Sequence, residues 1–153
     1  MKEPQALAGL VDPTRPQPEL TARILSCPCP GELRAGLLLM NGDWELAHQA
    51  SQALESPLAA HWHALVHRHE PDFDNAKYWY RRVGVSPVFA TLAAWAQQSI
   101  KIPDPAEGMI LHDPWDPFRF TDLFAAGHEG DWTRQVDRQE MGLLLEYSLK
   151  LAT

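Results

Sequence analysis

Residues 42–54 read GDWELAHQASQAL, and residues 71–83 read PDFDNAKYWYRRV. The two stretches lie about 29 residues apart and share, in the same order, an aspartate, an aromatic residue, an acidic residue, an alanine and an aliphatic end. A fixed offset of this size is the sequence signature of a stacked supersecondary unit. The near-repeat therefore predicts the fold, because it places the same short helix at corresponding positions of two repeating units.

Helix start signals surround the repeated stretches. Residues 56–57 and 86–87 both read Ser-Pro, which places a capping serine before a proline in the first helical turn. Asp43 and Asp72 each stand where a carboxylate can cap the helix that follows. Each repeated stretch therefore forms the second helix of a hairpin, and the segment before it forms the first.

These signals predict an all-α fold of antiparallel helical hairpins stacked as a short repeat array. Apolar residues at helical spacing run from Gly31 to Lys101 and indicate two hairpins plus the first helix of a third. We expect a C-terminal helix to cover the array. This helix carries four apolar residues on one face, which are Met141, Leu144, Leu145 and Leu149.

The hairpins resemble tetratricopeptide and Sel1-type repeats. Ala47 and Ala76 match the small position of the second helix in those families, and Tyr80 matches the aromatic residue four positions later. The turns at residues 42–44 and 71–73 also match. The resemblance implies that the small residues let two antiparallel helices approach closely while aromatic residues fill the space beside them.

This resemblance covers about residues 31–100, and its period is shorter than the 34 residues of the tetratricopeptide repeat. Residues 67–82 also resemble a group of bacterial proteins, a likeness that implies no mechanism. We expect residues 1–17 to form an extended arm, and residues 18–153 to form a single helical-repeat domain.

Composition excludes some classes of function. The chain has 153 residues and a net charge of −7, which argues against binding nucleic acid, because that affinity rests on basic patches. No apolar run is long enough to cross a membrane, and residues 1–20 lack the apolar core of a signal peptide. We therefore expect a cytoplasmic protein in which Cys27 and Cys29 are ordinary reduced thiols.

Four of the seven histidines fall within nine residues of one expected helix. His63 and His67 are four residues apart, so both can face one metal ion, and Glu70 can add an oxygen ligand. A further ligand would come from another segment, and His112 on the loop at residues 103–117 is the candidate. This pattern indicates a protein or enzyme that binds a divalent transition metal.

A non-enzymatic module that binds a protein or peptide, with no cofactor, is the first hypothesis from the sequence. His63, His67, Tyr78 and Arg81 would form its binding surface, because the repeated units differ where function is expected and agree where the fold needs them. The metal site described above is the alternative. A scaffold subunit that forms a homo-oligomer is a third reading.

Overall fold

The computed structural model describes residues 15–102, 114–127 and 132–153, and within these residues the chain is all-α, as the sequence predicts. The described residues form eight helices and no strand. The helices are α1 (Pro18–Ser26), α2 (Gly31–Met40), α3 (Trp44–Gln52), α4 (Pro57–His69), α5 (Phe73–Val83), α6 (Pro87–Ser99), α8 (Pro117–Ala126) and α9 (Trp132–Ala152).

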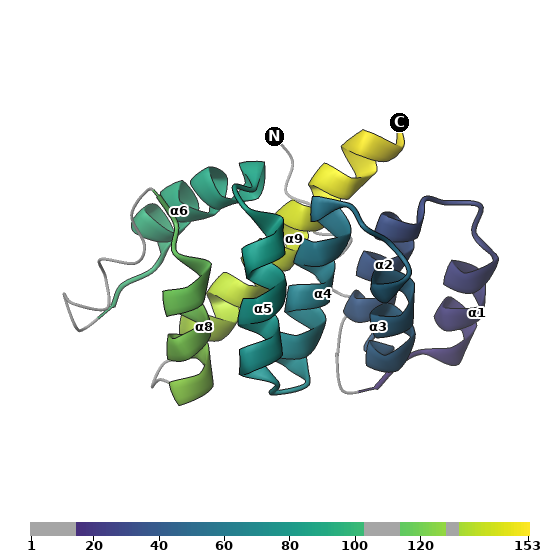
Figure 1. Ribbon diagram of the computed structural model, residues 1–153, viewed down its shortest axis with the longest axis horizontal. Coiled ribbons are helices and arrows are strands. Elements are labelled where there is room, and N and C mark those ends of the chain that lie inside the picture. Colours follow the sequence, from purple (N-terminus) through teal and green to yellow (C-terminus); the bar gives the residue numbers. More distant parts are fainter. Residues whose placement is uncertain (1–14, 103–113, 128–131) are drawn as a thin grey trace.

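The two predicted hairpins are present and stack on each other. Helix α2 packs against α3, α4 packs against α5, and α3 packs against α4. Figure 1 shows these helices side by side in a row, with α1 at one end. The near-repeat of the sequence thus corresponds to α3 and α5, the second helices of the two hairpins.

The third place in the row differs from the expectation. Helix α8, rather than α6, lies beside α5, while α6 packs chiefly on α9 (Figure 1). Gly84 explains the change of direction, because it follows α5 with φ of 65° and ψ of −128°, a conformation that glycine adopts readily. The predicted helix therefore forms, but it turns away from the stack.

Helix α9 covers the row of helices, as predicted, and contacts helices from both ends of it. It crosses behind the hairpins in Figure 1 and packs against α2, α6 and α8. Its Trp132 and Val136 belong to one apolar cluster, and its Met141 and Leu144 belong to another. Leu149 departs from the predicted face, because its side chain is 43% exposed near the end of the helix.

The helix caps follow the sequence with one exception. The hydroxyl of Ser56 accepts a hydrogen bond from the backbone N–H of Ala59. The carboxylate of Asp72 accepts one from the backbone N–H of Asn75. Asp43 does not cap α3. Its carboxylate instead accepts hydrogen bonds from the hydroxyl of Thr21 (2.8 Å) and the amide of Asn41 (2.7 Å), so it holds α1 against the first hairpin.

Close packing between α2 and α4 depends on a glycine. A Cβ atom on Gly36 would lie 2.4 Å from the ring of Trp62, so only glycine allows this approach. Trp62 is fully buried and donates a hydrogen bond to the hydroxyl of Ser148 in α9. Most of the predicted arm at residues 1–17 and most of the loop at residues 103–117 lie outside the described residues.

Membrane insertion through a helix finds no support in the described part of the chain. None of its helices combines the length and the apolar character that a membrane span needs.

Candidate metal centre

Three histidine side chains meet between α3 and α4. His48 comes from α3, and His63 and His67 come from one face of α4, and one ligand atom from each lies within 4.8 Å of the others. The rings of His63 and His67 stack with their centres 4.8 Å apart. The ring of His48 stands edge-on to both, at 4.7 Å and 5.1 Å. We call these three side chains the histidine triad.

The triad is buried without the hydrogen bonds that buried polar groups normally make. His63 is 2% exposed, and neither of its ring nitrogens has a hydrogen-bond partner among the described residues. The Nδ1 atom of the buried His67 also lacks one. An unpaired buried polar atom costs about 1–3 kcal/mol, and such exceptions in a folded protein call for an explanation.

The surroundings of His63 and His67 favour the neutral form of their rings, which is the form of histidine that binds metals. Burial lowers the pKa of His63 to about 3, and a positive charge on His67 or His48 would act in the same direction. Burial also lowers the pKa of His67, with His48 adding to this effect and Asp72 opposing it. At neutral pH the two buried rings therefore each offer a nitrogen lone pair.

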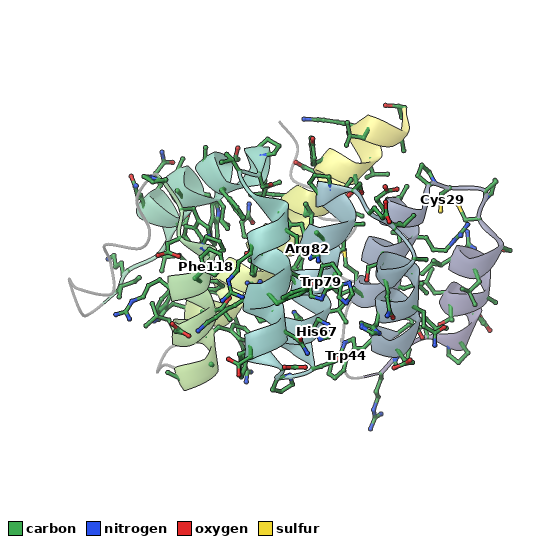
Figure 2. The ribbon with its side chains drawn as sticks, viewed as in Figure 1. Cys29, Trp44, His67, Trp79, Arg82 and Phe118 are labelled. Atoms are coloured by element: carbon green, nitrogen blue, oxygen red, sulfur yellow. The ribbon has the colours of Figure 1, made fainter. Side chains whose placement is uncertain are left out.

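Trp79 of α5 forms the wall of the triad opposite α3. Its ring lies flat on the ring of His63, with centres 3.8 Å apart and planes tilted by 15°. The guanidinium of Arg82 lies 5.3 Å from the centre of the Trp79 ring. Figure 2 shows Trp79 and Arg82 close together on α5, above His67. This stacking fixes the plane of the His63 ring and shields it from solvent.

Carboxylates lie at the open side of the triad. An oxygen of Glu70 is 3.7 Å from Nδ1 of His67, and an oxygen of Asp72 is 3.8 Å from the same atom. Burial raises the pKa of Glu70, the nearby Glu45 and Asp72 raise it further, and His48 lowers it. Hydrogen bonds from Asn75 lower the pKa of Asp72, so this group stays anionic. The cluster is therefore suited to attract a cation.

The structure brings together some of the predicted site residues and separates others. His63, His67 and Glu70 lie together, whereas His112 is outside the described residues. Tyr78, which is 42% exposed, and the exposed Arg81 lie on the outer side of α5. His63 and His67 are buried and do not share that surface with them.

Sequence reasoning missed His48. The preceding residue of α3, Ala47, is fully buried, and α3 packs directly on α4. The useful signal was therefore the predicted contact between the two hairpins, because any histidine on α3 near that contact can approach His63 and His67.

A second buried polar cluster lies on the opposite side of α4. Arg68 is fully buried and donates to Asp137 at 2.6 Å, to Glu140 at 3.2 Å and to the hydroxyl of Tyr80 at 2.9 Å. The Tyr80 hydroxyl donates to Glu140 at 2.6 Å. His69 and His61 approach Asp137 and Glu140 at 2.9 Å and 3.4 Å. We call this set the arginine network.

The guanidinium of Arg68 and the two carboxylates of the arginine network are charged and are paired with one another. Burial alone raises the pKa of Asp137 and Glu140, but the adjacent Arg68 outweighs it and holds both below their usual range. Burial also raises the pKa of Tyr80 well above its ordinary value. These carboxylates therefore act as permanent partners of Arg68 that join α4 to α9.

Comparison with known proteins found no matching family model, no curated relative and no similar solved structure.

Proposed function

We propose that this protein binds one divalent transition-metal ion through His48, His63 and His67. The observation that carries the proposal is the convergence of three histidines, among which both ring nitrogens of His63 and the Nδ1 atom of His67 are buried without a hydrogen-bond partner among the described residues. Coordination to a metal would supply those missing bonds, and this would offset the cost of burying them.

The ligand chemistry defines the class of metal. Imidazole nitrogens suit zinc, nickel, iron and copper, whereas soft thiolate sites favour copper(I). No cysteine belongs to the cluster of possible ligands among the described residues, and Figure 2 shows Cys29 well away from His67. A divalent ion of intermediate hardness is therefore the proposed ligand.

The side chains of the triad would rotate to close around such an ion. Zinc–nitrogen bonds of about 2.1 Å place tetrahedral ligand atoms about 3.4 Å apart. The nitrogens of the triad lie within 4.8 Å of one another. The rings of His63 and His67 are stacked with their planes 21° apart, and an imidazole lone pair lies in the plane of its ring, so His67 as well as the half-buried His48 would rotate to aim a nitrogen at the ion.

Calorimetric titration of the metal-free protein with Zn²⁺, Ni²⁺ and Co²⁺ tests the proposal. We expect one ion per chain, and we expect His48→Ala to abolish binding while leaving the helical circular dichroism unchanged. Gln52→Ala on the exposed side of the same helix is the matched control and retains binding. At a free metal concentration of 100 times Kd, the bound ion raises the free energy of unfolding by about 2.7 kcal/mol. Equal binding by wild type and His48→Ala would exclude this site.

The outer face of α5 favours a second function, the docking of an acidic protein or peptide. The guanidinium of Arg82 lies 5.0 Å from the ring centre of the exposed Tyr78, and Arg81 lies beside it on the surface. Such aromatic and cationic groups are enriched at interfaces. A pull-down with wild type and Arg81→Ala tests this function, and recovery of the same proteins by both variants argues against it.

A further inference from the structure

Three imidazoles fill three positions of a metal ion and leave at least one position open. The identity of the group at that position decides whether the bound ion is enclosed by protein or free to bind a small anion. This inference rests on the proposed metal site, and it concerns the carboxylates at the open side of the triad.

Glu70 is placed to reach the open position. It is the residue that ends α4, where its backbone N–H bonds to the carbonyl of Val66. Its carboxylate oxygen lies 3.7 Å from Nδ1 of His67, and it is close enough to His48 to interact with it electrostatically. Its side chain is 31% exposed. Among the described residues this carboxylate accepts no hydrogen bond, so turning it toward a metal breaks none.

Asp72 is at a similar distance but is engaged elsewhere. Its carboxylate accepts a hydrogen bond from the backbone N–H of Asn75 at 3.4 Å and from the side-chain amide of Asn75 at 2.7 Å. These bonds cap the start of α5. Turning Asp72 toward a metal would break the cap, which costs about 1 kcal/mol. Glu70 moves without such a cost.

We propose that Glu70 supplies the fourth ligand, so that the ion is held by three imidazoles and one carboxylate. The charges agree with this set, because imidazole coordinates a metal in its neutral form and a dication relieves the repulsion between Glu70, Glu45 and Asp72. A set of three nitrogens and one oxygen suits Zn²⁺, Co²⁺, Ni²⁺ and Fe²⁺ and disfavours copper(I).

The visible absorption of the Co²⁺-loaded protein tests the proposal, because these bands report the ligands and the coordination number. We expect Glu70→Gln to shift the bands and to lower Co²⁺ affinity about tenfold or more. We also expect azide to change the spectrum of Glu70→Gln at concentrations that leave wild type unchanged, because the variant exposes the fourth position. Glu45→Gln is the matched control and retains the wild-type spectrum.

The possible results separate this inference from the metal site itself. A wild-type protein that binds no Co²⁺ overturns both. Co²⁺ bound with equal affinity and identical spectra in wild type and Glu70→Gln overturns only the role of Glu70. A spectral shift in Asp72→Asn without one in Glu70→Gln also overturns it, because the ligand would then be the other carboxylate.

Discussion

Helix α4 contributes to two polar clusters that differ in how their polar atoms are paired. In the arginine network, each charge meets an opposite charge, and Arg68 alone donates to Asp137, Glu140 and Tyr80. In the histidine triad, buried ring nitrogens have no partner among the described residues. Both clusters contain buried polar side chains, although His48 of the triad is only half-buried. In the arginine network only Nδ1 of His61 lacks a partner among the described residues, whereas three nitrogens of the triad lack one, so we propose a structural role for the network and metal binding for the triad.

Breaking the arginine network has the largest expected effect. Arg68→Met leaves the buried carboxylates of Asp137 and Glu140 without their cation. Removal of one partner from a buried ion pair costs about 3–5 kcal/mol, and urea denaturation measures this as a lower midpoint. Arg81→Met on the exposed side of α5 is the control and changes stability by less than about 0.5 kcal/mol. Equal losses in the two variants would mean that the network contributes little.

The two clusters lose their contributions to stability in different pH ranges, and the expected loss of stability is smaller than that of Arg68→Met. The pKa values of His63 and His67 are lower in the folded protein, so their favourable contribution is complete above about pH 6.5 and is lost as the pH falls toward the folded values. The pKa values of Asp137 and Glu140 are also lower in the folded protein. Their contribution is complete above about pH 4.5 and is lost below it.

We therefore expect the stability of the metal-free protein to fall in two stages as the pH decreases. Urea midpoints measured between pH 8 and pH 3 follow both stages. In His63→Leu the decrease between pH 6.5 and pH 4.5 becomes smaller, while the decrease below pH 4.5 remains. A decrease between pH 6.5 and pH 4.5 that is unchanged in His63→Leu contradicts the assignment of the first stage to the triad.

The smallest effect is expected for His63→Leu at neutral pH without metal. This substitution removes two unpaired nitrogens and their burial cost, and it also removes the stacking on Trp79, which is worth about 0.5–1.5 kcal/mol. The two terms oppose each other, so the free energy of unfolding stays within about 1 kcal/mol of wild type. Thermal and urea denaturation check this. A loss as large as that of Arg68→Met would show that the triad is itself a structural cluster.

The sequence predicted the helices well because their signals are local. The serine caps, the prolines at first helical positions and the apolar spacing each act within a few residues, and α2 to α5 follow them. The sequence also indicated His63 and His67 as a pair, because residues four apart on a helix share a face.

Features that depend on long-range packing were not predictable in the same way. The place of α8 beside α5 follows from the turn at Gly84, and the contribution of His48 follows from the packing of α3 on α4. The buried pairing of Arg68 could not be predicted, because its partners lie 69 and 72 residues further along the chain. Nothing in the local pattern of α4 distinguishes a buried arginine from an exposed one.

The long sequence separation between the buried residues of α4 and their partners in α9 has a consequence for how the chain folds during synthesis. Repeat solenoids stabilise each unit through contacts with its immediate neighbour, so they can fold progressively from the first unit. Here the ribosome completes α4 long before it produces the carboxylates that neutralise Arg68, and the hydroxyl that pairs with Trp62 lies 86 residues after it. We therefore expect the nascent hairpins to remain loosely packed until α9 emerges, so that the whole domain folds in one late, cooperative step.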